Sequence, residues 1–214
     1  MITFQTPAPI AVTVEVLSAG VTVIASDRSD TTVEIKPADA TKKADVRAAE
    51  QTTIDFTDGA LTVTTPKSWR THTPFGGNPT IEVTIQVPDG SQLRSTAGVG
   101  HLLGAGALGS CDVTVSLGDI VIERPQGSVT AKAAKGNIRI GEAVRGELRL
   151  ETSVGELEVG ISPTSAVRLE TNTTSGTVHN MISPVAAAHD PADTVEVFAR
   201  NSVGDIVIGH IVAA

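Results

Sequence analysis

Apolar and polar residues alternate with a period of two along most of the chain, and helical periodicity is almost absent. The longest example covers residues 81–87, where every second residue is Ile or Val, and shorter ones cover residues 12–16, 33–35 and 61–63. A strand with this pattern buries one face and exposes the other to water. The pattern therefore predicts an all-β protein, in which only residues 40–50 have the composition of a short surface helix.

Two segments interrupt the alternation and are predicted to be long loops. Residues 66–79 contain three prolines and a Gly-Gly pair, which are incompatible with a regular ladder. We interpret this segment as the loop of a hairpin whose strands are residues 61–65 and 81–87. It holds the only tryptophan, Trp69, together with Phe75. The second loop, residues 183–193, is rich in Ala, Pro and Asp.

From residue 100 onward, a glycine followed by a polar residue and a short alternating strand recurs along the chain. The glycines are spaced 18, 18, 19, 21 and 28 residues apart, and the longest interval contains residues 183–193. A partner strand precedes each glycine. One such unit cannot cover its own apolar face, so several units are expected to stack and bury a continuous core. The repeated glycines are Gly100, Gly118, Gly136, Gly155, Gly176 and Gly204.

The repeats predict a β-solenoid, similar to a single-stranded parallel β-helix, with coils about 4.8 Å apart and a glycine at one corner of each coil. An antiparallel β-sandwich of hairpins is the alternative, because the sequence does not show the direction of the strands in space. We expect a single domain over residues 1–214, with N-terminal strands and the long loop in residues 1–95 and the repeats in residues 96–214. The predicted inward residues are Ile120, Ile122, Ile138, Ile140, Leu157, Val159, Ile206 and Ile208.

Several runs of sequence carry a resemblance to a known family. They are residues 25–35, 42–50, 144–161 and 202–208, together with the repeated units of Ser or Thr, any residue, Gly, an acidic or amide residue, and Ile or Leu. The chain resembles the bacterial β-strand-repeat proteins of unknown function that carry the label "putative adhesin", in their actinobacterial form. The resemblance covers essentially the whole chain. It implies a β-solenoid-like fold and brings no established activity, cofactor or catalytic residue.

Composition narrows the classes of partner. Hydrophobic residues make up 40% of the chain and aromatic residues only 2%, and the net charge is −8. An acidic chain of this kind is a poor match for nucleic acid or for an anionic membrane surface. The single cysteine, Cys111, leaves no intrachain disulfide to form. The sequence shows no signal peptide and no transmembrane run, so a cytoplasmic location is expected.

Two sets of polar side chains are candidates for a binding site. If the coils stack in register, the residues that follow the glycines form a column, which would hold a metal ion such as Ca²⁺ or would close turns by bonding to nearby backbone. The turn-closing role is the expected one. Outward side chains of the partner strands form further columns, with Lys132 paired to Glu151, Arg149 stacked on Arg168, and Glu151 on Glu170. The residues that follow the glycines are His101, Asp119, Asn137, Glu156, Thr177 and Asp205.

No histidine, cysteine or serine pattern of a catalytic or metal site is present in the sequence, and no cofactor is expected. We therefore predict a non-enzymatic structural or interaction protein, adhesin-like, that binds an unidentified protein partner or itself. A polysaccharide lyase or hydrolase is the alternative, by analogy with enzymes that have a β-helix fold.

Two regions are predicted as interaction surfaces. One is the loop with Trp69 and Phe75. The other is the C-terminal end of the stack, where residues 195–208 form the last coil and the apolar tail holds Ile211 and Val212. An open end of a solenoid needs a cap. We expect that end to be covered by residues 183–193 or to dock against another chain.

Overall fold

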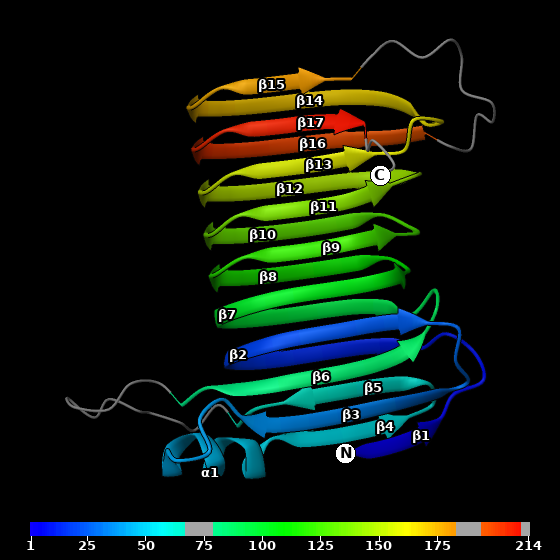
Figure 1. The fold of residues 1–214 in the computed structure, drawn as a ribbon, viewed down its shortest axis with the longest axis vertical. Coiled ribbons are helices and arrows are strands. Elements are labelled where there is room, and N and C mark those ends of the chain that lie inside the picture. The colour runs from blue at the N-terminus through cyan, green and yellow to red at the C-terminus, as the bar shows by residue number, and fades with distance from the viewer. Residues whose placement is uncertain (67–78, 183–193, 211–214) are drawn as a thin grey trace.

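The computed structural model describes residues 1–66, 79–182 and 194–210, which form 17 strands and one helix. The strands wind round a long axis as stacked coils (Figure 1). Successive coils pair in parallel and in register, so the predicted solenoid is confirmed and the antiparallel sandwich is not what forms. Each coil contributes one strand to each of two facing sheets.

The first sheet contains the strand that precedes each repeat glycine, and the second sheet contains the strand that follows it. The first sheet runs in space through β8 (Cys111–Leu117), β10 (Val129–Lys135), β12 (Gly146–Val154), β16 (Thr194–Val203) and β14 (Ala166–Ser175). The second sheet runs through β9 (Ile120–Pro125), β11 (Ile138–Ala143), β13 (Leu157–Ile161), β17 (Ile206–His210) and β15 (Val178–Met181).

Two long strands begin the stack and cross both sheets. β2 (Ala11–Ser26) pairs in parallel with β7 (Gln92–Leu108) along most of its length, and β7 then pairs with β8 and with β9. The repeat pattern did not reveal that β2 belongs to the stack. The reason is that its corner lacks the repeat glycine: Ala19 is the register partner of Gly100.

The core consists of aliphatic side chains that both sheets direct inward. All eight predicted inward residues of the repeats are at most 1% exposed, which confirms the assigned faces. In the second sheet they lie in columns along the stack: Ile138 lies between Ile120 of one neighbouring coil and Leu157 of the other. Because a fully buried aliphatic side chain stabilises a fold by about 1.5–3 kcal/mol, such columns hold the coils together without aromatic residues.

The repeat glycines lie in one line along a corner of the stack, as predicted. Gly136 has φ +152°, and a Cβ atom built on it would lie 2.0 Å from the carbonyl oxygen of Gly118 in the next coil. Gly155, Gly204 and Gly176 have the same relation to the glycine of the coil beside them. A residue with a Cβ atom would therefore push neighbouring coils apart at this corner, which explains the near-constant glycine spacing.

The order of the coils in space differs from their order in the chain. The coil β16–β17 is inserted between β12–β13 and β14–β15 (Figure 1). The prediction that residues 195–208 form the last coil is therefore wrong: β14 and β15 form it. The inward residues explain the order, since β16 buries Val195, Val197 and Ala199 completely. At two positions the β14–β15 coil has a polar residue, which tolerates solvent, where the β16–β17 coil buries an apolar one: Thr171 is the register partner of Ala199, and Asn180 that of Ile208.

The N-terminal part closes the opposite end. β5 (Ala60–Thr64) pairs with the first half of β2, and β6 (Ile81–Pro88) with the second half, so the predicted hairpin between these two strands does not form. Beyond them lie β4 (Thr53–Thr57), β3 (Asp30–Pro37) and β1 (Ile2–Gln5), all antiparallel to their neighbours.

Aromatic rings and the helix fill and cover this end. The rings of Phe4 and Phe56 stack with centroids 4.8 Å apart and pack against the core. The helix α1 (Lys43–Gln51), close to the predicted residues 40–50, lies on β3 and β6. Its buried Asp45 accepts hydrogen bonds from the backbone N–H groups of Asp39 and Thr80 at 3.2 and 3.1 Å, which ties the helix to both flanking segments.

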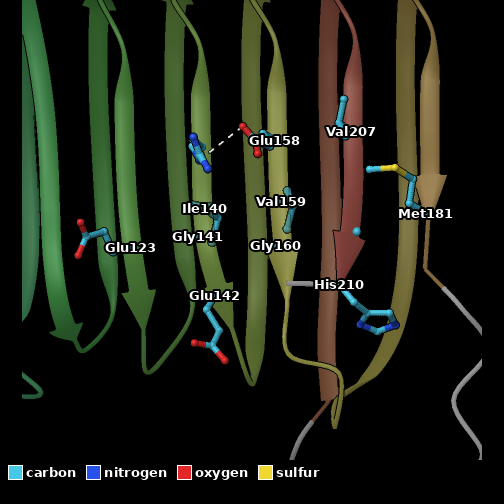
Figure 2. A pocket seen from close by; sticks show the side chains of 12 residues that line it. Glu123, Ile140, Gly141, Glu142, Glu158, Val159, Gly160, Met181, Val207 and His210 are labelled. Atoms are coloured by element: carbon cyan, nitrogen blue, oxygen red, sulfur yellow. Dashed lines mark ion pairs between the residues drawn. The ribbon is translucent and has the colours of Figure 1, made fainter. Parts of the chain in front are cut away.

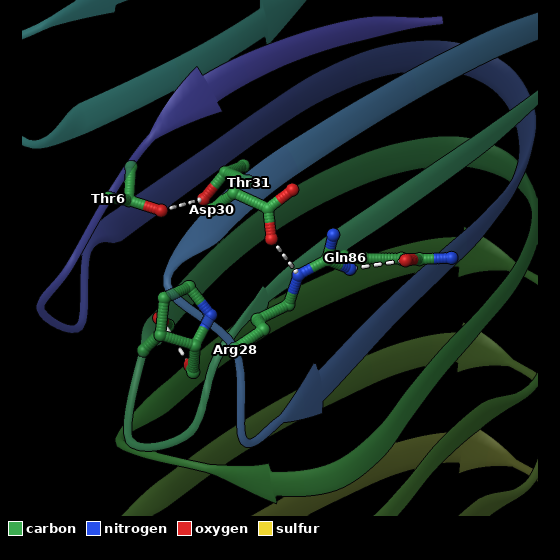
Figure 3. A network of polar contacts seen from close by, with 7 residues as sticks. Thr6, Arg28, Asp30, Thr31 and Gln86 are labelled. Atoms are coloured by element: carbon green, nitrogen blue, oxygen red, sulfur yellow. Dashed lines mark hydrogen bonds and ion pairs between the residues drawn. The ribbon is translucent and has the colours of Figure 1, made fainter.

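A polar network joins β1, β3 and β6 at the same end (Figure 3). The hydroxyl groups of Thr6 and Thr31 are 2.8 Å apart and buried. Arg28 donates to Asp30 at 2.9 Å and also to Gln86. The hydrogen bond from Arg28 and its positive charge hold the pKa of Asp30 below its usual value. These bonds hold the strands of this end together, because each of the named side chains bonds to another of them.

Candidate functional site

The four residues predicted as interaction sites, Trp69, Phe75, Ile211 and Val212, lie outside the described residues. Their role stays a prediction. The other candidate groups lie within the described stack and can be located. They fall on the glycine corner, on the outer face of the first sheet and on the outer face of the second sheet.

Three of the six polar residues that follow the glycines bond to the backbone of a neighbouring coil. Oδ1 of Asp119 accepts from the N–H of Asn137 at 2.7 Å, and Oδ1 of Asn137 accepts from the N–H of Glu156 at 2.8 Å. Asp205 makes the same bond to the N–H of Thr177 at 2.7 Å. Bonds to backbone were expected for the column, but these join neighbouring coils, 18–28 residues apart in the chain, and do not close the turn in which each side chain lies. Within residues 1–66, 79–182 and 194–210, no three metal-ligating side chains cluster together.

The outer face of the first sheet carries ion pairs between neighbouring coils. Lys132 lies 3.5 Å from Glu151, as predicted. The predicted stacking of Arg149 on Arg168, and of Glu151 on Glu170, is wrong, because β16 lies between the strands that carry them.

The inserted strand β16 supplies partners to both neighbours. Glu196 pairs with Arg168 at 3.1 Å, Arg200 pairs with Glu170 at 3.1 Å, and the ring of Phe198 lies 4.8 Å from the guanidinium carbon of Arg149. These three contacts join groups that attract one another, whereas Glu147 and Glu196 are register partners of like charge. Exposed pairs of this kind contribute little to stability, and they leave the face largely neutralised.

Cys111 is a packing residue in the first strand of the repeats. It is 3% exposed, and burial raises the pKa of its thiol to about 12. The thiol is therefore protonated at neutral pH and is a weak nucleophile.

A shallow groove crosses the outer face of the second sheet (Figure 2). Its floor is the backbone of Gly141, Gly160 and Gly209, which lie in successive coils. A Cβ atom on Gly141 would lie 2.4 Å from the carbonyl oxygen of Glu123, and Met181 lies across Gly209. The groove has a volume of about 420 Å³ and is open to solvent along its length.

The walls of the groove are mainly acidic. Arg139 pairs with Glu158 at 3.4 Å on one side (Figure 2). Glu123 and Glu142 lie along the groove, and Oε2 of Glu123 accepts from the N–H of Gly106 at 3.2 Å. With three carboxylates and one guanidinium, the groove favours polar or cationic groups.

An exposed apolar ridge runs along the glycine corner, one residue before each glycine. Val99, Leu117, Lys135, Val154 and Val203 are register partners in successive coils. The four aliphatic members are 38–48% exposed, and Leu17, which is 49% exposed, lies beside the first of them. We call the set Leu17, Val99, Leu117, Val154 and Val203 the corner ridge.

The corner ridge has an acidic border. Asp119, Glu156 and Asp205 follow the glycines two residues after ridge members, so their charges lie in a parallel row. Contiguous exposed apolar surface with a polar rim is typical of an interaction site. The ridge was readable in the sequence as an apolar residue directly before the glycine of four repeats, but it carries meaning only once the coils are known to be in register.

No helix among the described residues combines the length and the apolar character that a membrane span requires. A search of curated proteins finds no match to the chain. Among solved structures, a "putative cell adhesion protein" from Clostridium sporogenes is similar with a TM-score of 0.55 at 14% identity, covering 98% of each chain. A "putative adhesin" from Bacteroides fragilis has a TM-score of 0.46 at 11% identity and covers 96% of this chain and 94% of its own.

At 14% identity, the likeness to the Clostridium protein shows a shared fold. The actinobacterial form of the resemblance stays a prediction. The family model described as Toastrack DUF4097 matches residues 10–181, which run from the residue before β2 to the end of β15. Since this match spans most of the sequence, the chain belongs to the Toastrack (DUF4097) family.

Proposed function

We propose that this chain is a non-enzymatic, adhesin-like binding protein whose corner ridge docks a protein partner. The observation that carries the proposal is the register of the ridge: four aliphatic side chains that are 38–48% exposed occupy the same position of the coil, in a line that only Lys135 interrupts. Apolar side chains exposed singly need no explanation, but four of them at the same position of the coil do. The name of the Clostridium protein agrees with a role in adhesion.

The geometry of the ridge favours an amphipathic helix as the docking element. Positions along the ridge recur about every 4.8 Å, the distance between paired strands, and Lys135 occupies the position between Leu117 and Val154. An α-helix rises about 5.4 Å per turn, so apolar residues at one position per turn nearly match this spacing. The acidic row of Asp119, Glu156 and Asp205 favours Lys or Arg on the side of the helix that faces it. The proposed partner therefore presents a helix with an apolar stripe and a basic flank.

Two synthetic helical peptides test this chemistry. Both carry leucine once per turn, and one has lysine flanks whereas the other has glutamate flanks. We expect NMR shifts of the intact protein to change along the corner ridge with the lysine peptide and to change much less with the glutamate peptide. The variant Leu117→Ser/Val154→Ser should bind at least about tenfold more weakly, which corresponds to about 1.4 kcal/mol.

The matched control is Arg139→Ser/Glu158→Ser, which changes two exposed residues on the outer face of the second sheet. It should bind the peptide as the unchanged protein does. Shift changes elsewhere, or equal binding by the ridge variant, would refute the ridge as the docking surface. The unchanged protein, the ridge variant and the control variant can then serve as bait in extracts of the native cell. A partner that only the ridge variant fails to capture would be identified in this way.

The enzymatic alternative has a direct test. Most glycoside hydrolases need two positioned carboxyl groups, and the groove is where Glu123, Glu142 and Glu158 gather. We expect no new reducing ends when the protein is incubated with polygalacturonate and related glycans. Release of reducing ends that is abolished by Glu142→Gln would replace the binding proposal with an enzymatic one.

A further inference from the structure

The end coil of the stack has one unpartnered side. β14 pairs only with β16, and β15 only with β17, among the described strands (Figure 1). Each strand therefore has a second edge whose backbone N–H and C=O groups have no ladder within the described part of the chain. Such an edge is a template for a further strand.

The side chains of the end coil are also less covered than those of the coil beside it. Val167 and Leu169 are only partly buried, whereas their register partners Val195 and Val197 are 0% exposed. On the other sheet, Val178 is 38% exposed. A terminal coil of a solenoid needs a cap with a polar outer face, and no described element lies outside β14 and β15.

We propose that this end joins a second copy of the same chain, with β14 of each copy antiparallel across a two-fold axis. The charge pattern of β14 is the reason. Arg168, Leu169 and Glu170 have opposite charges on either side of an apolar residue. In an antiparallel pair centred on Leu169, Arg168 lies opposite Glu170 of the second copy, and Glu170 lies opposite its Arg168.

The joint would also extend the charge ladders already present in each chain. Arg168 lies 3.1 Å from Glu196, and Glu170 lies 3.1 Å from Arg200. Across the joint, one ladder becomes Glu196, Arg168, then Glu170 and Arg200 of the second copy, and alternation of sign is preserved throughout. A parallel arrangement would instead place Arg168 against Arg168, which is repulsive.

The other end of the stack limits the assembly to two copies. There, α1 and the stacked rings of Phe4 and Phe56 cover the core. A two-fold joint uses the same surface on both copies and closes on itself, whereas head-to-tail contacts would need two open ends and would form filaments. The joint is separate from the corner ridge, so it goes beyond the proposed function. The dimer can be disproved while the binding role of the ridge still holds.

Charge reversal tests the joint in the intact protein by sedimentation equilibrium. We expect the unchanged chain to dimerise in a concentration-dependent manner. Arg168→Glu and Glu170→Arg, each alone, place like charges at both symmetric contacts and should weaken the dimer at least about tenfold. An equimolar mixture of the two variants should restore dimers, because each variant then complements the other. The double variant Arg168→Glu/Glu170→Arg should also dimerise.

The matched control is Lys132→Glu, which reverses one charge of an exposed pair in the middle of the same face. It should leave the dimer unchanged. Circular dichroism and thermal unfolding show whether every variant is folded, since exposed pairs contribute little to stability. A chain that stays monomeric at about 1 mM, or single variants that dimerise as the unchanged chain does, would overturn the proposal.

Discussion

Replacement of Ile138 tests the stacked core most sharply. Ile138 is 0% exposed and lies between Ile120 and Leu157, both of which are also 0% exposed. Loss of a buried Ile side chain to Ala costs about 2–5 kcal/mol, depending on how far the site can collapse. The backbone ladders hold neighbouring coils about 4.8 Å apart, so collapse is restricted and Ile138→Ala should cost about 4 kcal/mol. Ile138→Val should cost about 1 kcal/mol.

Arg139 provides the matched control one residue away. Its side chain is 61% exposed and pairs with Glu158 at 3.4 Å on the outer face. Arg139→Ala should cost less than about 0.5 kcal/mol, because exposed ion pairs contribute little. Ile138→Asp should prevent the repeats from folding, since it buries a charge without a partner.

Urea unfolding followed by far-UV circular dichroism measures the difference. With an m-value of about 3 kcal/mol per M, Ile138→Ala should lower the midpoint by about 1 M or more, and Arg139→Ala should hardly change it. Equal midpoints for the two variants would refute the assignment of inward and outward faces. A change in the m-value would instead indicate that the coils unfold separately.

Three further predictions follow from particular residues. Gly136→Ala should lower the unfolding free energy by roughly 2 kcal/mol or more, because its Cβ atom would lie 2.0 Å from the Gly118 carbonyl oxygen at a φ of +152°; an unchanged melting temperature would contradict the glycine corner. The lowered pKa of Asp30 means that the folded state binds fewer protons there, so its stabilisation is present above about pH 4 and is lost as the pH falls through the folded pKa. Asp30→Asn should therefore flatten the loss of stability on acid titration, and an unaltered titration would contradict the network. Cys111, whose pKa burial raises to about 12, should resist iodoacetamide at pH 9 in the folded chain and react after unfolding in urea; rapid labelling of the folded chain would contradict its burial.

Local patterns predict the coils well because each coil repeats one local requirement. Alternation assigns inward residues such as Ile120 and Val159 to the buried face, and both are at most 1% exposed. The glycine corner is predictable for the same reason, since only glycine allows the backbones to approach there. The inward positions and the glycine corner are needed wherever two coils stack, whichever two coils they are.

The order of the coils was predicted wrongly, because it depends on which of two similar strands, far apart in the chain, pairs with β12. β16 and β14 have the same alternation, so the pattern alone does not say which of them lies next to β12. One inward position distinguishes the two strands: β14 has Thr171 where β16 has the buried Ala199, so β14 is better suited to border solvent. The same reasoning shows why the pairing of Lys132 with Glu151 was predicted correctly, whereas the neighbour of Arg168 was not.

The candidate binding surfaces were only partly predictable. A bond from Asp119 to backbone follows from its residue type and position, but its donor, the N–H of Asn137, lies in the next coil and not in the same turn. The corner ridge needed the register, because Leu117 and Val154 are 37 residues apart in the chain and two coils apart in space. The predicted sites at Trp69 and Ile211 lie outside the described residues and stay predictions.

Disulfide trapping tests the central claim, which is that the C-terminal coil is inserted before the end coil. In a Cys111→Ala background, Glu147→Cys/Glu196→Cys places cysteines on register partners of adjacent strands. Their Cα atoms should be about 4.8 Å apart, within the range that a disulfide spans. Glu147→Cys/Arg168→Cys places them two strands apart, about 9.6 Å and out of reach. Oxidation should cross-link the first pair and not the second, as read by mass spectrometry of the digested protein. Cross-linking of the second pair and not the first would show that the coils stack in chain order, and would contradict both the inserted coil and the end joint.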